Sequence, residues 1–313
     1  MKKNGVIPLV VAFTPNYFVP AATCLLSVLK YSDKSDRFHI IVLLSEDLPD
    51  NMMGKLELLD DDRMSFSFLN LEGQLADIYV NEKYTVAASY RLLLPELLVE
   101  YDKVLYIDCD MIIRNNLAEL YRNTDLKSNY LAGVFEATLD FQEAHLKEIG
   151  CQPGEYINSG FLIMNLALMR KDKMTGKFLE ASKADYLEFP DQDVLNQLCK
   201  GKILGLSPQY NSIRTFFLPQ YKNNFFKYYA QKDWEDVQNH GNIHYTGAKP
   251  WNAYTVKFID WWTMYGMLPQ TIKKEWLENK KLRLLSSILR TSVGRIAMNL
   301  MQRLVRGLKY RNN

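Results

Sequence analysis

The stretch KVLYIDCDMII, residues 103–113, is the most informative part of the sequence. Its apolar run at 104–107 is typical of a buried strand, and Asp108-Cys109-Asp110 follows directly. Because strand side chains alternate between faces, we expect Asp108 and Asp110 to point the same way. Two carboxylates at a strand end form a site of hard oxygen ligands for a divalent cation, and such a cation can neutralise a diphosphate.

Strand and helix patterns alternate on both sides of this stretch. We predict strands at 9–13, 38–44, 65–69, 130–135, 160–165, 203–206 and 243–245, and helices at 19–29, 51–59 and 86–98. This alternation predicts an α/β fold with a mostly parallel sheet. Ligands of such sheets bind at the carboxyl ends of the strands. The Rossmann G-x-G-x-x-G and the P-loop signature are both absent, so any phosphate must be held in another way.

Three further motifs place polar residues beside predicted strands or at a helix start. They are Asn158-Ser159-Gly160 before an apolar strand, Asp191-Gln192-Asp193 at the start of a helix, and IHYTGAKPW with His244, Gly247 and Lys249. Each also has a purely structural interpretation, respectively a turn, a helix cap and a buried structural histidine. Helix capping accounts for one acid of the second motif but not for two acids flanking a glutamine.

The composition is that of a soluble globular protein, with 313 residues, 48% hydrophobic and 24% charged. No run of about 18 apolar residues suggests a membrane span. The net charge of +2 hides an asymmetry, because residues 280–313 hold nine basic residues and no acidic one, which leaves the rest at −7. Four cysteines stand far apart, which argues against a disulfide framework or zinc knuckle and favours a reducing compartment.

The C-terminal region carries an apolar stripe at helical spacing, with basic residues largely on the other side. The stripe consists of Leu282, Leu285, Leu289, Val293, Ile296, Leu300 and Leu304. This pattern predicts a basic amphipathic helix on an anionic membrane surface, and the alternative is a helix docked on the acidic body of the protein. We therefore expect a cytoplasmic protein, peripheral on the inner face of the plasma membrane. The nearby aromatic residues Trp251, Trp261, Trp262 and Tyr265 either border an acceptor site or close the core, and we favour the core.

The four motifs, in this order, resemble those of glycosyltransferase family 8, retaining enzymes related to bacterial lipooligosaccharide galactosyltransferases and to glycogenin. The resemblance covers about residues 5–255. It implies a GT-A fold at 1–255, a single Rossmann-like mixed sheet flanked by helices, followed by an aromatic and helical segment at 256–313 with the basic tail at 280–313. It also implies Mn²⁺, a UDP-sugar donor, and transfer of glucose or galactose to a hydroxyl of a cell-surface polysaccharide, lipooligosaccharide or glycoprotein.

The same resemblance implies roles for individual residues. Asp108, Asp110 and His244 would bind Mn²⁺, with Cys109 between the two acids. Ala12, Asn16 and Tyr17 would hold uridine, with Thr14 standing where the family has an acid. Arg91, Asn158, Asp191 and Gln192 would line the donor sugar, and Gly247 and Lys249 would clamp the diphosphate. Glu136 lies near an acidic position of the family. Asp191 and Gln192 are the catalytic candidates, and we favour front-face attack over a double displacement.

Two alternatives remain open at this level. A haloacid-dehalogenase-type phosphatase would use Asp108 as its nucleophile, but it wants Thr or Val where Ile112 stands, and the motif lies late in the chain. A non-catalytic membrane-binding protein would account for the tail and leave the four motifs as coincidence. No nucleic-acid partner is expected, and the oligomeric state is open.

Overall fold

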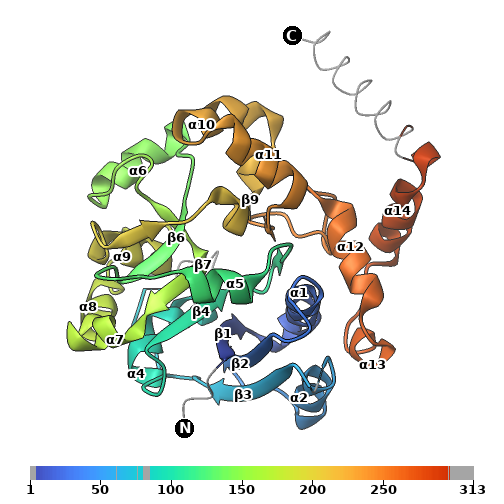
Figure 1. Ribbon diagram of the computed structural model, residues 1–313, viewed down its shortest axis with the longest axis horizontal. Coiled ribbons are helices and arrows are strands. Elements are labelled where there is room, and N and C mark those ends of the chain that lie inside the picture. The colour runs from blue at the N-terminus through green and yellow to red at the C-terminus, as the bar shows by residue number, and fades with distance from the viewer. Residues whose placement is uncertain (1–4, 61, 76, 80–84, 295, 297–313) are drawn as a thin grey trace.

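A seven-stranded mixed sheet forms the centre of the molecule (Figure 1), in the order β3-β2-β1-β4-β7-β6-β8. The computed structural model describes residues 5–60, 62–75, 77–79, 85–294 and 296. The strands are β1 (Val6–Phe13), β2 (Arg37–Leu44), β3 (Met64–Asn70), β4 (Lys103–Ile107), β6 (Leu131–Phe135), β7 (Ile157–Asn165) and β8 (Ile203–Gly205). Strands β1 to β4 are parallel, whereas β7 is antiparallel to both of its neighbours. The expectation of a mostly parallel sheet is confirmed, because β7 alone runs against the other strands of this sheet. The direction of β7 leaves no mark on hydrophobic periodicity.

Helices cover both faces of this sheet. They are α1 (Phe18–Lys30), α2 (Asp50–Glu57), α3 (Val86–Ser89), α4 (Leu94–Leu97), α5 (Leu117–Asn123), α6 (Glu143–Glu148), α7 (Leu166–Lys171), α8 (Met174–Ala181), α9 (Pro190–Leu198), α10 (Lys222–Tyr228), α11 (Gln231–His240), α12 (Phe258–Met267), α13 (Gln270–Lys273) and α14 (Lys280–Arg290). The single helix predicted at 86–98 is wrong. It is divided into α3, a 3₁₀ turn at Tyr90–Leu93 and α4, because Pro95 lacks the N–H that a continuous helix needs.

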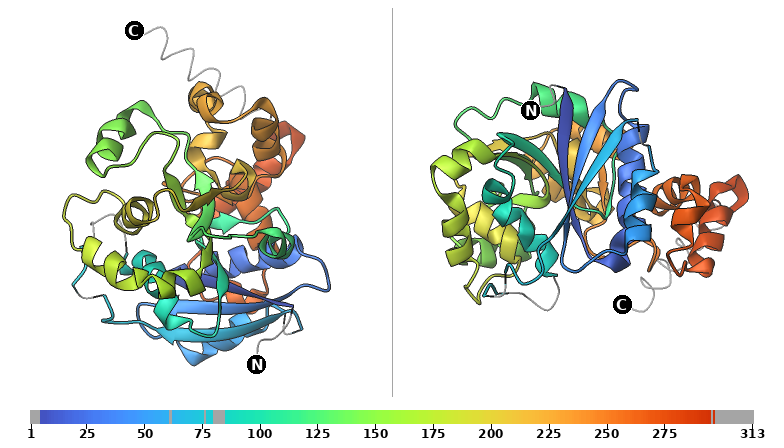
Figure 2. Two further views of the ribbon diagram at one scale, coloured as in Figure 1. Left: turned by 60° about the vertical axis from the view of Figure 1, so that its left-hand side comes forward. Right: turned by 90° about the horizontal axis from the view of Figure 1, so that it is seen from below.

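The alternation of side chains along β1 divides the core into two layers. Leu9 and Val11 face a cluster shared with α1 and α12, while Val10 faces a cluster shared with α4, α7, α8 and α9. Figure 2 shows these helices on opposite sides of the sheet in the view from below. Strands β1 and β4 are apolar on both faces because both of these faces are covered.

A small three-stranded sheet, β5-β10-β9, supplements the single sheet that was expected. Its strands are β5 (Met111–Ile112), β9 (Ser212–Ile213) and β10 (Ile243–His244). His244 pairs with Met111 across β10 and β5, and Tyr245 N donates to Asp110 O at 3.0 Å. This pairing brings the histidine motif beside the acidic motif. The strand predicted at 243–245 includes β10, whereas β5 and β9 are too short for periodicity to reveal.

The C-terminal segment packs on the same core as β1. Trp251, Trp261, Trp262 and Tyr265 are all buried, which confirms their predicted place in the core. Leu289 is buried and Leu282 and Leu285 are half-buried, and all three pack against that core. The first part of the predicted apolar stripe is therefore used for docking on the body, which corrects its assignment as a membrane-facing side.

The rest of the stripe differs from this first part. Val293 and Ile296 are exposed, while Leu300 and Leu304 lie outside the described residues. Among the helices of the described residues, none has both the length and the apolar character needed to cross a membrane. The division of the chain at residue 255 stays a prediction.

Candidate active site

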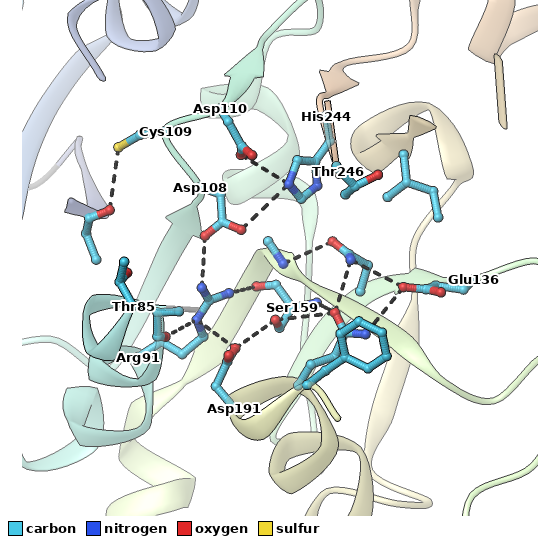
Figure 3. A pocket seen from close by; sticks show the side chains of 18 of the residues that line it. Thr85, Arg91, Asp108, Cys109, Asp110, Glu136, Ser159, Asp191, His244 and Thr246 are labelled. Carbon is cyan, nitrogen blue, oxygen red and sulfur yellow. Dashed lines mark hydrogen bonds and ion pairs between the residues drawn. The ribbon is translucent and has the colours of Figure 1, made fainter. Parts of the chain in front are cut away.

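The candidate site is a cavity of about 630 Å³ bordered by the carboxyl ends of β1 and β4. Figure 3 shows its interior. Nearly all of the predicted site residues line it: Ala12, Thr14, Tyr17, Arg91, Asp108, Cys109, Asp110, Asn158, Asp191, Gln192, His244, Gly247 and Lys249. Asn16 is the exception, because it is exposed, does not line this cavity and accepts a hydrogen bond from Thr14 Oγ1. Cys109 directs its sulfur away from the two acids, 3.7 Å from Ala12 O.

Three potential metal ligands meet at one side of the cavity. Oxygens of Asp108 and Asp110 and a ring nitrogen of His244 all lie within 4.8 Å of one another. Both acids stand in the turn between β4 and β5 rather than in the strand itself. Their convergence confirms the expected orientation, but the turn rather than strand alternation produces it.

The hydrogen bonds around His244 leave its second ring nitrogen facing an oxygen of Asp110. Its Nδ1 lies 2.9 Å from Asn211 Oδ1, and since an amide oxygen only accepts, Nδ1 is the donor. In the neutral imidazole this contact leaves a lone pair on Nε2, 3.2 Å from Asp110 Oδ1. That carboxylate oxygen is buried and accepts no hydrogen bond from the described residues. Two lone pairs that face each other in a buried place fit a shared cation, and Asn211 is the outer partner that fixes the ring.

Gly160 provides the space in which these ligands meet. A Cβ atom at this position would lie 2.3 Å from His244 Cε1 and 2.6 Å from Asp108 Oδ2, which is closer than real contacts allow. The backbone of β7 can therefore pass directly beneath the ligands only as glycine.

Lys249 supplies positive charge on the far side of Asp110. Its Nζ donates to Asp110 Oδ2 and, at 2.8 Å, to Tyr245 O. Burial alone would raise the pKa of Asp110, but the positive charge of Lys249 outweighs it and holds that pKa below its usual range. The carboxylate is thus kept ionised, as a metal ligand must be. Tyr17 lies nearby, and burial raises the pKa of its phenol to about 12.

Arg91 connects the acidic turn to the start of α9. It is buried, and its guanidinium lies 2.9 Å from Asp108 Oδ1 and 3.2 Å from Asp191 Oδ2. It also donates to Ser159 O and stacks 4.2 Å from the centre of the Tyr106 ring. Burial opposes its charge, yet the two carboxylates raise the pKa of Arg91 above its usual value. The arginine is therefore a fixed positive charge between two acids.

A second network surrounds Gln192. Its Oε1 accepts hydrogen bonds from Ser159 N at 2.9 Å and from Asn158 Nδ2 at 3.0 Å. Glu136 accepts from Asn158 at 3.3 Å and from Gln142 at 3.1 Å. Burial raises the pKa of Glu136, and these amide donors oppose the rise. This wall of the cavity therefore consists mainly of fixed amides.

Some residues of the site escape sequence reasoning. Asn211 and Gln142 belong to no motif. Asn211 hydrogen-bonds to His244 and to Asn158, which lie in distant segments, and Gln142 donates to Glu136, six residues earlier in the chain. Ser159 and Gly160 lie inside a quoted motif but were not assigned a role. The only sequence signal for Ser159 and Gly160 is their position between Asn158 and the apolar strand.

The fold and the site define a glycosyltransferase of the GT-A fold. The bifunctional glycosyltransferase WbbM superposes with a TM-score of 0.73 at 21% identity, over 88% of this chain and 52% of that one. The galactosyltransferase LgtC, solved in complex with donor and acceptor sugar analogs, superposes with a TM-score of 0.69 at 25% identity, over 86% of this chain and 100% of that one.

The model of glycosyl transferase family 8 matches residues 8–255, and the chain belongs to that family. General stress protein A of Bacillus subtilis (strain 168) is 26% identical over 264 residues, 82% of this chain and 91% of that protein. A lipopolysaccharide 1,2-glucosyltransferase of Escherichia coli (strain K12) is 28% identical over 225 residues, 70% of this chain and 64% of that protein. The match to a Haemophilus influenzae putative glycosyltransferase spans 60% of that protein's length. Neither the phosphatase nor the non-catalytic alternative finds support in these relationships.

Proposed function

We propose that the protein transfers a hexosyl group, glucose or galactose, from a UDP-sugar to a hydroxyl of a cell-surface glycan, with Mn²⁺ and with retention of configuration. Family membership supports glycosyl transfer. Relatives named as a lipopolysaccharide glucosyltransferase and a galactosyltransferase support a hexose and a glycan acceptor.

The observation that carries the proposal is that Asp110 Oδ1 and Nε2 of a neutral His244 face each other beside Asp108, and each has a free lone pair. These residues would hold the cation, and mixed carboxylate and imidazole ligation favours Mn²⁺ over Mg²⁺. When bound, the cation would supply positive charge where a diphosphate leaving group becomes more negative.

Two basic residues of the chain would also stabilise the diphosphate leaving group, one directly and one through the acids it holds. Lys249 would clamp a phosphate as a point charge, and its contact with Asp110 keeps it at the cation site before the donor arrives. Arg91 is held between Asp108 and Asp191 and would act mainly by fixing these two acids. Preorganised charges of this kind typically lower a barrier by several kcal/mol.

The contacts of Asp191 and Gln192 support front-face attack. Asp191 Oδ2 lies against Arg91 and accepts a hydrogen bond from Ser159 Oγ at 2.8 Å, and Gln192 Oε1 accepts from two donors. Neither oxygen is a free nucleophile. In the front-face reaction the bond from the anomeric carbon to the phosphate oxygen breaks and a bond to the acceptor oxygen forms. The acceptor proton passes to the departing phosphate oxygen.

The test is a donor panel with the full chain. UDP release is measured with UDP-glucose, UDP-galactose and UDP-N-acetylhexosamines, with Mn²⁺, Mg²⁺ or EDTA, and NMR of the product gives the anomeric configuration. We expect turnover with one UDP-hexose and Mn²⁺, and an axial linkage from an axial donor. Absence of turnover with every UDP-sugar and acceptor would contradict the proposal. Gln192→Ala should slow transfer without abolishing it, whereas a trapped adduct on Asp191 or Gln192 would contradict front-face attack.

We also propose that residues 280–313 hold the enzyme against an anionic membrane, on the cytoplasmic side. The buried side of α14 is occupied by the core, but Leu284 and Ile288 on the opposite side are 62% and 48% exposed. Lys280 and Lys281 are exposed on the same helix. An exposed apolar pair among basic residues fits the boundary of an anionic bilayer.

Liposome sedimentation tests this second proposal. The double variant Leu284→Glu with Ile288→Glu should pellet less with anionic vesicles than the wild type does, while Leu58→Glu, a change at a residue that is 72% exposed elsewhere, should leave pelleting unchanged. Equal pelleting of all three proteins would exclude this side of α14 as the membrane contact.

A further inference from the structure

One carboxylate beside the site has no part in the chemistry proposed above. Asp193 is fully buried and does not line the cavity. Its Oδ2 accepts hydrogen bonds from Glu188 N and Phe189 N, each at 3.0 Å. His145 Nε2 lies 3.0 Å from the same oxygen, and Tyr156 OH donates to Oδ1. Four donors thus surround one carboxylate, and they meet most of its capacity to accept hydrogen bonds.

The donors come from three segments that surround the start of α9. His145 belongs to α6, Tyr156 immediately precedes β7, and the two backbone donors belong to the turn that leads into α9. A second contact also ties α9 to β7. Asn196 on α9 exchanges hydrogen bonds of 2.8 and 2.9 Å with the backbone of Ile157. The first turn of α9 is therefore fixed from several sides at once.

That first turn carries the residues proposed to face the donor sugar. Asp191 and Gln192 directly precede Asp193 in the chain, and their side chains reach Arg91 and Ser159 in the cavity. A helix turn held by a buried carboxylate keeps its neighbours in one orientation, and a displacement of about 1 Å at a reacting centre costs up to about a hundredfold in rate.

We propose that Asp193 is a positioning residue, and that Asp193, His145 and Tyr156 form a buried clamp that aims Asp191 and Gln192 into the cavity. The inference rests on the proposed roles of those two residues. It also separates the two outer acids of the D-Q-D motif, because Asp191 faces the cavity and Asp193 faces the clamp. Asp193 has no lone pair directed at the substrate and does not act as a nucleophile.

His145 offers a matched pair of variants. Its Nδ1 is buried, makes no hydrogen bond among the described residues and lies 4.0 Å from Glu188 Oε1, so the hydrogen bond of the ring to Asp193 is made through Nε2. His145→Gln keeps an N–H donor near that position, while His145→Leu keeps the bulk and removes the donor. Neither His145 nor Asp193 lines the cavity.

The kinetic test compares the full chain with His145→Gln, His145→Leu and Asp193→Asn. The probes are the UDP-hexose that the wild type uses, its acceptor, and Mn²⁺ with UDP alone. We expect kcat for transfer to fall about tenfold or more in His145→Leu and Asp193→Asn, and His145→Gln to recover most of it. The ratio of transfer to hydrolysis should fall with kcat, since this ratio does not depend on the fraction of folded enzyme. The affinity for Mn²⁺ and UDP should change less than about twofold, because their proposed ligands lie on other elements.

Hydrogen exchange gives a second readout that needs no turnover. Amides at 188–189 should exchange faster in His145→Leu and Asp193→Asn, while those of α12 should not change. Unchanged exchange in both variants would overturn the clamp whatever the activity. Faster exchange with an unchanged transfer-to-hydrolysis ratio would overturn its positioning role, and so would a glycosyl adduct on Asp193. A wild type without transfer would instead overturn the proposed function, while hydrogen exchange would still decide the clamp.

Discussion

Asp110 is held as an anion by its neighbours, and this makes it sensitive to loss of charge. Asp110→Asn removes a proposed cation ligand and leaves the half-buried Lys249 without its carboxylate partner. We expect transfer to fall at least about a hundredfold and the stabilisation by Mn²⁺ with UDP in thermal melting to disappear. Asp185→Asn, at an exposed acid, should retain both activity and the shift. Wild-type metal binding by Asp110→Asn would contradict the assignment.

Gly160 tests the geometry of the cation site without touching a ligand. Gly160→Ala places a methyl group against His244 and Asp108, so we expect weaker Mn²⁺ binding and a loss of activity of about tenfold or more. The control is Gly176→Ala in α8, where nothing lies within 4 Å of the added Cβ atom. That change should be neutral or stabilise the fold by about 0.5–1 kcal/mol. Titration calorimetry and urea unfolding measure the two effects.

Glu136 is expected to lower the stability of the fold at neutral pH. Burial raises its pKa above the usual 4.5, so the folded protein binds its proton more tightly than the unfolded chain does. The stabilisation from this group is complete below pH 4.5 and is lost as the pH rises through the raised value. Glu136→Gln should therefore raise Tm by a few degrees at pH 7.5, and its advantage should shrink towards pH 4. An equal gain at both pH values would assign the effect to packing.

The site was predictable from sequence where its residues cluster in short motifs. Asp108 with Asp110, and Asp191 with Gln192, are separated by at most one residue, so one local pattern reveals each pair. Asn211 and His145 escape because their roles depend on hydrogen bonds between segments that only the fold brings together. Asp193 was visible in its motif, but its burial and its donors were not.

At the scale of elements, α14 carries a prediction about stability. Its residues Leu282, Leu285 and Leu289 pack against the main core. A chain ending after Asn279 should be several kcal/mol less stable than one ending after Arg290, because burying such side chains contributes about 1.5–3 kcal/mol each when complete. Urea unfolding of the two truncated proteins measures the difference. Equal stabilities would show that the docking of α14 is energetically unimportant.

The elements that the sequence predicted best are long and apolar. Strands β1, β2 and β4 were located because both of their faces are largely buried, which produces nearly continuous apolar runs. Strand β3 is half-buried and alternates Ser with Phe. Of the two-residue strands, β10 falls within the strand predicted at 243–245, whereas β5 and β9 have no such pattern. Whether β7 runs parallel or antiparallel depends on pairing with β4 and β6, and no local property of its sequence encodes that choice.

At the scale of the whole molecule, the separation of charge carries the last prediction. The region 280–313 holds nine basic residues and no acidic one, while the remainder has a net charge of −7. If the basic region binds anionic lipid, sedimentation with such vesicles should weaken steeply between about 0.1 M and 1 M salt, where the screening length falls from about 10 Å to 3 Å. Catalysis in solution should change much less. Binding that persists in high salt would point to a mainly apolar contact.

The pairing of β10 with β5 has a consequence for biosynthesis. It joins the acidic turn to a histidine far along the chain, so the third proposed cation ligand is in place only after residue 244 has left the ribosome and paired beside Met111. A partly translated chain therefore holds the two acids without the histidine. The proposed cation site is therefore complete only when β10 has paired with β5.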